Sequence, residues 1–154
     1  MSLEKARAFL AERGLADRII EFETSTATVS LAAAALGVPD DAIAKSVALY
    51  AGQQPILVLT KGTARIDNRK FKDTFLAKPK MIPFEEVETV IGHAPGGVCP
   101  FGRNEGVPVY LDESLKAFNR VYPAAGNDHT AVNLSIAELE SATRGSWVDV
   151  TKSS

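Results

Sequence analysis

Residues 92–102, GHAPGGVCPFG, are the stretch of this sequence best suited to chemistry. Four of the chain's eleven glycines lie in it, and Pro95 and Pro100 restrict the same segment. Backbone amides can approach a ligand closely at glycine because no Cβ intervenes, and such donors suit an oxyanion or a bound water. A tight turn under a sheet would explain the same residues without any ligand. The stretch therefore predicts either an amide-lined ligand loop or a structural turn.

Two common phosphate-binding motifs do not fit this loop. A Walker loop needs Lys and then Ser or Thr after its glycines, whereas Val98 and Cys99 follow Gly97. No GxGxxG sequence follows an expected strand, so a dinucleotide-binding fold is not supported. The chain has one cysteine and two histidines far apart, which argues against a zinc site. These patterns indicate neither a Walker loop, nor a dinucleotide-binding fold, nor a structural zinc site.

Lys45 is the second candidate for chemistry. It opens the apolar stretch KSVALY, and in a strand it shares a face with Val47 and Leu49. A lysine on an apolar face is costly to bury unless it has a partner or reaches water. The side chain either extends to solvent at the start of the strand or presents its ammonium at the floor of a pocket.

Cys99 and the two histidines are weaker candidates. A catalytic cysteine needs a nearby base, and His93 is six positions away in a loop. A lone cysteine is more often a small buried apolar residue. His129 lies in the polar turn AAGNDHTAVNL before an expected strand, where a pocket wall or a surface position suits it better than the role of a base.

Helices and strands that do not strictly alternate must position these residues. The apolar patterns predict strands over 18–22, 45–50, 55–60, 107–111, 131–135 and 147–150. Capping residues and periodicity predict helices that start after Ser2, near 31–38, at 68–75 after Asp67, at 83–91 before Gly92, and near 136–142 after Ser135. This order favours an α+β fold with a curved, mixed sheet.

Length and charge narrow the function classes. The 154 residues suit one domain, 1–154, with one core. We expect a cytoplasmic location because the start lacks the pattern of a signal peptide, no apolar run could span a membrane, and one cysteine allows no internal disulfide. The net charge of −2 argues against broad wrapping of nucleic acid. Residues 61–80 nevertheless carry seven basic and two acidic side chains, which form either a solvated face or a phosphate-contacting patch.

The order of several segments resembles the YbaK/prolyl-tRNA-synthetase-associated domain family. These segments are ALGVPDDAIAKSVAL, PILVLTKG, the glycine loop, VPVYLDESL and YPAAGNDHTAVNLS, and the resemblance runs roughly from RIIEF to AELE. It implies a barrel-like, curved mixed sheet flanked by helices. It also implies hydrolysis of amino acids wrongly attached to tRNA, and this reaction is expected to need neither a metal nor a cofactor.

The resemblance assigns roles to individual residues. Lys45 stands at the essential lysine of the family, and Gly96 and Gly97 stand where backbone amides would act in catalysis. Gly92, Pro95 and Gly96 match the GxxPG pattern of alanine-removing members, while Gly97, Pro100 and Gly102 fit the GGxxPxG form of cysteine-removing and related members. The expected substrate contacts are Gly92, His93, Pro95, Cys99, Pro100, Phe101, Gly102 and His129.

The predicted function is therefore trans-editing. The chain would hydrolyse the ester of a small mischarged amino acid (Ala, Ser, Thr or Cys) on tRNA, with tRNA(Pro) the expected substrate. Expected partners are the acceptor end of mischarged tRNA, contacted in part by Arg69, Lys70 and Lys72, and a prolyl-tRNA synthetase; neither DNA nor a membrane is expected. The alternatives are a non-catalytic module that binds aminoacyl-tRNA ends, aminoacyl adenylates or nucleotides, and a protein that docks on a synthetase.

Overall fold

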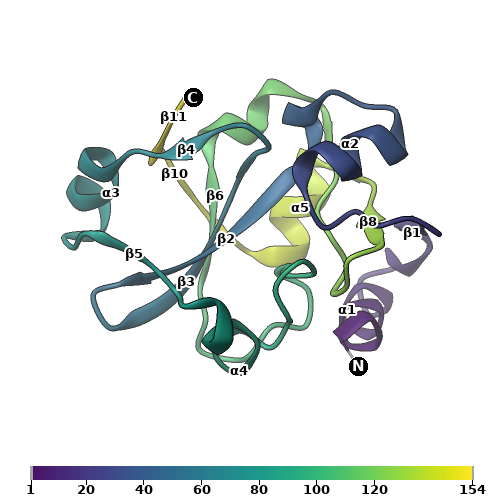
Figure 1. Cartoon of the computed structure of the whole chain (residues 1–154), viewed down its shortest axis with the longest axis horizontal. Helices are drawn as coiled ribbons and strands as arrows, with labels where there is room; N and C mark the ends of the chain where they lie inside the picture. Colours follow the sequence, from purple (N-terminus) through teal and green to yellow (C-terminus); the bar gives the residue numbers. More distant parts are fainter. Residues whose placement is uncertain (1, 154) are drawn as a thin grey trace.

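A five-stranded mixed sheet forms the centre of the computed structural model, which describes residues 2–153 (Figure 1). The strands follow the order β10-β6-β3-β2-β5, in which β6 is parallel to both of its neighbours and the other pairs are antiparallel. Their bounds are β2 Ala44–Ala51, β3 Gln54–Lys61, β5 Pro79–Met81, β6 Val109–Asp112 and β10 Ser146–Val148.

Three antiparallel pairs complete the strands: β1 (Ile19–Glu21) with β8 (Thr130–Val132), β4 (Arg65–Ile66) with β11 (Thr151–Lys152), and β7 (Arg120–Val121) with β9 (Leu134–Ser135). The predicted α+β class with a mixed sheet is confirmed. The end strands β10 and β5 do not pair with each other within residues 2–153, so closure into a barrel is not confirmed.

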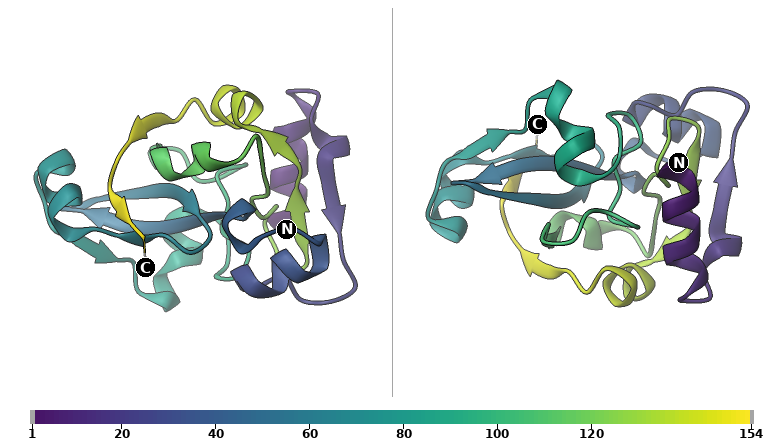
Figure 2. Two further views of the ribbon diagram at one scale, coloured as in Figure 1. Left: turned by 90° about the horizontal axis from the view of Figure 1, so that it is seen from above. Right: turned by 90° about the horizontal axis from the view of Figure 1, so that it is seen from below.

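Five α-helices flank the strands: α1 Ser2–Ala11, α2 Val29–Leu36, α3 Asn68–Phe75, α4 Val87–Ile91 and α5 Ile136–Thr143. Short 3₁₀ segments are η1 Ala16–Arg18, η2 Asp40–Ala42, η3 Phe84–Glu86 and η4 Glu113–Ala117. Figure 2 shows α3 at one end of the molecule and α1, α2 and the β1–β8 pair at the other. None of the helices described in residues 2–153 has the length and hydropathy that a membrane span requires.

Capping residues end and begin helices where the sequence predicts. The Asp67 carboxylate accepts from the amides of Arg69 and Lys70 at the start of α3. Ser135 and Glu138 form the expected capping box of α5, and Gly92 ends α4 at a φ of +102°. The expected cap at Ser2 is not found, because Ser2 already belongs to α1 instead of preceding it.

Several predicted boundaries shift. The helix expected over 83–91 consists of the 3₁₀ turn η3, Phe84–Glu86, followed by α4, Val87–Ile91. Helix α2 begins at Val29 instead of residue 31, because the Thr28 hydroxyl caps it by accepting from the amide of Leu31. The expected strand over 131–135 is split into β8 and β9. The expected strand over 147–150 ends early: β10 stops at Val148, Asp149 and Val150 belong to no strand, and β11 begins only at Thr151. The Val150 amide donates to the carboxylate of Asp112 instead of to a neighbouring strand.

Two apolar clusters lie on opposite faces of β2 and β3. Ala44, Ala48 and Leu57 belong to the larger cluster, which α1, α4 and α5 cover, while Leu49 and Val58 belong to the smaller one beside α3. Val47 packs with Leu49, as the alternation predicts for the face that Lys45 shares. Lys45 thus lies on an apolar face at the beginning of its strand.

Candidate active site

The outer edge of β2 has a gap in its strand pairing. At one end Ile43 forms a parallel bridge with Tyr122, and the Ala44 amide donates to the Tyr122 carbonyl. At the other end β5 pairs only with Leu49–Ala51, and the Ile82 amide extends this contact to the carbonyl of Ala48. No described strand covers residues 45–47 along this edge. Lys45, Ser46 and Val47 are each only partly buried at this gap.

Lys45 is half-buried in this gap, and its ammonium has one partner among the described residues. Nζ donates to the carbonyl oxygen of Ala64 at 2.7 Å. Burial and the nearby Arg65 charge hold the pKa of Lys45 below its usual value, and the Asp41 charge opposes this only in part. An ammonium can donate three hydrogen bonds, so further donors remain for a ligand.

A cavity of about 180 Å³ opens beside Lys45. Its remaining wall comes from the start of α2 and its preceding loop, from the start of β2, from the glycine loop and from residues 122–131. These residues are Thr26, Ala27, Thr28, Val29, Ala32, Ile43, Ala44, Ser46, Gly96, Val98, Tyr122, Ala124, Thr130 and Ala131. Its volume lies below the range of about 300–1,000 Å³ that is typical of drug-sized ligands and suits a ligand about as large as benzene, which a cavity of about 150 Å³ can hold.

The hydroxyls in this wall are largely committed to backbone. Thr26 donates to the Thr130 carbonyl, and the Thr130 hydroxyl accepts from the amide of Ala125. The Ser46 hydroxyl oxygen is buried and has no hydrogen-bond partner among the described residues. Eight of the other lining residues are Ala, Val or Ile, so much of the wall presents methyl groups.

Only part of the glycine loop reaches the Lys45 region. Gly96 and Val98 line the cavity, and Pro95 lines a groove on the other side of Lys45. Gly96 has a φ of +91°, which favours glycine, whereas Gly97 donates its amide to the Ala94 carbonyl at 3.0 Å. The Gly97 amide is thus used within the turn. The Gly96 and Val98 amides have no acceptor among residues 2–153.

The other two predicted loop glycines are in tight structural contacts. A Cβ on Gly92 would lie 2.7 Å from the side-chain oxygen of Asn104. The side-chain nitrogen of Asn104 donates to the carbonyls of Thr89 and Val90 in α4. A Cβ on Gly102 would lie 2.8 Å from the carbonyl oxygen of Lys5 in α1. Neither glycine lines the Lys45 cavity.

His93, Cys99 and Phe101 are fully buried in the core instead of lining the cavity. The Nε2 atom of His93 lies 2.7 Å from the Phe101 carbonyl, so it carries the proton and is a poor base for Cys99, 3.6 Å away. Burial raises the pKa of the Cys99 thiol to about 12. The thiol therefore stays protonated and unreactive near neutral pH.

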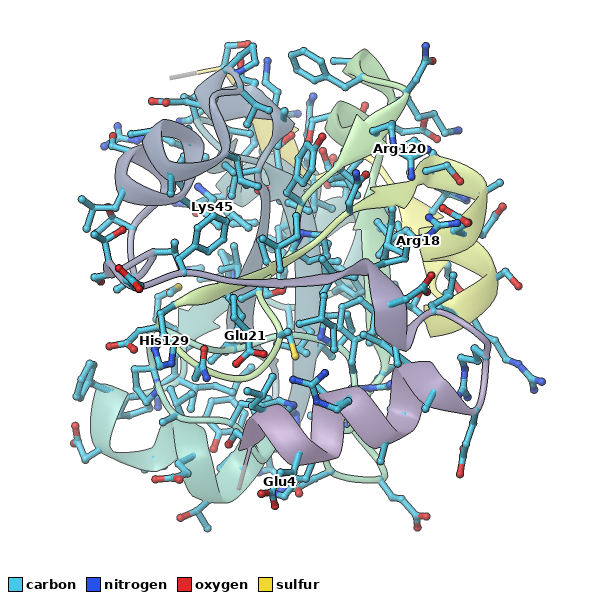
Figure 3. All side chains as sticks on the ribbon, turned by 90° about the vertical axis from the view of Figure 1, so that its right-hand side faces the viewer. Glu4, Arg18, Glu21, Lys45, Arg120 and His129 are labelled. Atoms are coloured by element: carbon cyan, nitrogen blue, oxygen red, sulfur yellow. The ribbon has the colours of Figure 1, made fainter. Side chains whose placement is uncertain are left out.

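Pro100 and His129 also lie outside the cavity. Pro100 is buried, and its carbonyl accepts from the guanidinium of Arg103 at 3.1 Å. The exposed His129 places Nδ1 3.0 Å from the Asp128 carboxylate and lines a hollow beside α1 and Glu88. Figure 3 shows Lys45 beneath α2, while His129 lies toward α4.

The three predicted tRNA contacts differ in their availability. Lys70 is engaged, because its ammonium donates to the Asp149 carboxylate at 3.0 Å and to the Thr151 carbonyl at 2.9 Å. Arg69 and Lys72 are exposed and border a surface hollow beside Lys78.

Residues 26–32 and 122–131 contribute most of the cavity wall, although the sequence indicated no role for the first segment. The Thr28 cap is the signal that marks the start of α2. The β1–β8 pair, the hydrogen bond from the Thr26 amide to the Asp128 carbonyl and the Ile43–Tyr122 bridge help to bring the two segments to Lys45, and none of these pairings is visible in local sequence.

Comparison with known proteins identifies relatives of this chain. The family described as the aminoacyl-tRNA editing domain matches residues 23–142. "Uncharacterized protein YwhH" of Bacillus subtilis (strain 168) is 43% identical, with 99% of this chain and 98% of that protein covered. A proline–tRNA ligase of the same organism is 33% identical over 111 residues. The match covers 71% of this chain but only 20% of the length of that enzyme.

A solved structure described as a "putative trans-editing enzyme for prolyl tRNA synthetase" superposes with a TM-score of 0.89 at 30% identity. The comparison covers 98% of this chain and 97% of the other. The protein named "Putative Cys-tRNA(Pro)/Cys-tRNA(Cys) deacylase EbsC" of Enterococcus faecalis (strain ATCC 700802 / V583) is 24% identical, with 77% of this chain and 74% of that protein covered.

Proposed function

Since the chain belongs to the aminoacyl-tRNA editing domain family, we propose that it is a single-domain trans-editing deacylase that hydrolyses a small amino acid from mischarged tRNA. The observation that carries the proposal is the position of Lys45. Its ammonium lies at the mouth of a cavity of about 180 Å³, with one backbone partner and with donors left for a substrate. The relatives named for prolyl-tRNA editing make tRNA(Pro) the favoured substrate.

The reaction is hydrolysis of the ester between the amino acid and the terminal ribose. Water adds to the ester carbonyl carbon, the carbonyl oxygen gains negative charge, and the bond to the ribose oxygen breaks as that oxygen takes a proton. The products are the free amino acid and intact tRNA. A hydroxyl of the same ribose can assist the proton transfer.

In this proposal Lys45 binds the substrate, and the amides of the glycine loop stabilise the oxyanion or hold the attacking water. The ammonium of Lys45 holds the polar part of the aminoacyl end by hydrogen bonds. The Gly96 and Val98 amides, which have no acceptor among residues 2–153, are the donors available to the developing oxyanion or to the attacking water. Gly97 contributes through the turn that fixes these amides, because its own amide donates to Ala94.

The cavity also orders the candidate amino acids. The methyl groups in its wall favour Ala and Cys over Ser and Thr. One methylene changes binding in an apolar pocket by only about 1–3 kcal/mol, which is why a separate editing site is useful to a synthetase.

A panel of aminoacyl-tRNAs tests the proposal. The purified chain is incubated with tRNA(Pro) charged with Ala, Cys, Ser, Thr or Pro, and loss of the ester is followed. We expect Ala or Cys to be released fastest and Pro to be spared. The K45A variant should be inactive, while K61A, which alters a lysine that pairs with Asp41, should stay active. Binding of these tRNAs without ester loss would instead support a non-catalytic module.

A further inference from the structure

A second, larger groove meets the aminoacyl cavity at Lys45. The two hollows share Lys45, Ser46 and Val98, which form the boundary between them. The groove has a volume of about 780 Å³, against about 180 Å³ for the cavity. It thus has room for a ligand several times larger than an amino acid side chain.

The groove follows the gap along β2. Residues 45–48 of β2 line one part of it, and residues 81–87 line another. These last residues belong to the chain that leaves β5 and turns into α4 (Figure 1). This part of the groove carries Met81 and Phe84, whose residues are 62% and 76% exposed. These are two of the four large apolar residues that the described chain leaves exposed, and they lie three positions apart on one groove.

A cation without a partner stands at the other side of the groove. Arg65 is exposed, lines the groove, and makes no hydrogen bond or ion pair through its side chain with another residue in 2–153. The positive charge of Arg65 lies close enough to Lys45 to lower the pKa of its ammonium. An anion bound at Arg65 would relieve this repulsion, so the groove combines exposed apolar side chains with a guanidinium that has no partner among residues 2–153.

We propose that this groove binds the terminal nucleotide of the substrate RNA, with its base against Phe84 and Met81 and its phosphate at Arg65. The inference rests on the proposed function. The substrate consists of an amino acid esterified to a nucleoside, and the two hollows meet at the residue assigned to the ester. Base stacking on an aromatic ring and a phosphate on a guanidinium are the two standard contacts for single-stranded RNA.

Binding of AMP tests the groove without any deacylation. AMP is titrated into the labelled protein and amide shifts are recorded for wild type, F84A, R65A and the control L76A, which removes another exposed side chain (88%) outside the groove. We expect shifts along residues 45–48 and 81–87, and a loss of AMP affinity of about five- to 100-fold in F84A. R65A should weaken AMP but not adenosine, and L76A should match wild type.

The same variants are then compared in the deacylation assay. F84A should raise KM by a similar factor with little change in kcat, since Phe84 contacts only the leaving nucleoside. Failure of AMP to bind wild type, or equal affinity in F84A and L76A, would overturn the groove assignment even if ester hydrolysis is observed. Phe84-dependent AMP binding without any hydrolysis would support the groove and contradict the deacylase proposal.

Discussion

Gly97 and Asn127 are in backbone contact: a Cβ on Gly97 would lie 2.5 Å from both the Cα and the amide nitrogen of Asn127. Real Cβ atoms do not occur at such distances. The contact holds the glycine loop against the segment that supplies Ala124 and Thr130 to the cavity wall. Glycine is needed here for space, since Gly97 does not have a positive φ.

The G97A variant should lose both stability and activity. The added methyl group must push the loop away from Asn127, and overpacking of this kind costs about 1–3 kcal/mol of unfolding free energy. The shift also moves the Gly96 and Val98 amides, so kcat/KM per folded molecule should fall. G106A is the control, because its Cβ meets nothing within 4 Å, so it should lose stability through its φ of +84° but keep kcat/KM. Wild-type melting and activity in G97A would contradict the contact.

The pKa of Lys45 should respond to both of its charged neighbours. The Arg65 charge lowers this pKa and the Asp41 charge raises it. R65A should therefore raise the pKa of Lys45, and D41N should lower it further. The measurement is a titration of the Lys45 side-chain carbon signal by NMR. An identical midpoint in all three proteins would mean that neither charge reaches the ammonium.

The pKa shift of Lys45 also sets the sign of its effect on stability. The unfolded chain binds the Lys45 proton more tightly than the folded chain does, because the folded-state pKa is the lower one. The group therefore disfavours folding while it is protonated, and this penalty fades as pH rises through the folded pKa. K45A should accordingly melt at the wild-type temperature or above it at pH 7.

C99S should keep deacylase activity within about twofold of wild type. The thiol is fully buried, its pKa is raised to about 12, and it does not line the cavity, so no covalent step involves it. Initial rates on the preferred aminoacyl-tRNA check the expectation. Intact-mass detection of an acyl group on Cys99 would contradict it.

Arg69 and Lys72, if they contact tRNA phosphates, should set part of the salt dependence of tRNA binding. Each lost duplex contact reduces the slope of log K against log salt by about 0.9, so R69A/K72A should flatten it by about one to two units. Lys70 is left in place because it ties α3 to Asp149 and Thr151. The control variant R7A/K116A removes the same amount of charge elsewhere and should keep the wild-type slope. An unchanged slope in R69A/K72A would mean that Arg69 and Lys72 do not contact tRNA.

Glu138 should make stability depend on acid pH. Hydrogen bonds from Arg18 and from the Ser135 amide lower the pKa of Glu138 from its usual 4.5 to about 2. Its contribution to the unfolding free energy is present above pH 4.5 and is lost as pH falls toward 2. E138Q should be less stable than wild type at pH 7, and the difference should shrink toward pH 2 in denaturant titrations. The variant E12Q controls for the loss of one exposed carboxylate. A stability difference between E138Q and wild type that does not change with pH would contradict the lowered pKa of Glu138.

Several elements could be predicted because their signals lie within a few residues. Asp67 before α3, the Ser135–Glu138 box of α5 and Gly92 after α4 each act on the adjoining turn of the helix. The alternation in β2 likewise placed Lys45 on the face of Val47 and Leu49. The less accurate boundaries, around β8, β9, β10 and β11, are those where short strands depend on partners far along the chain.

Sequence also carried the family resemblance, since the order of its segments needs no coordinates. The assignment of glycine-loop residues depended on tertiary structure. Gly96 and Gly97 are adjacent and chemically identical, yet one lines the cavity and the other donates its amide to Ala94 and packs on Asn127. Which face of a loop meets a ligand depends on the segments packed against it, here residues 26–32 and 122–131, and no local pattern specifies how such distant segments meet.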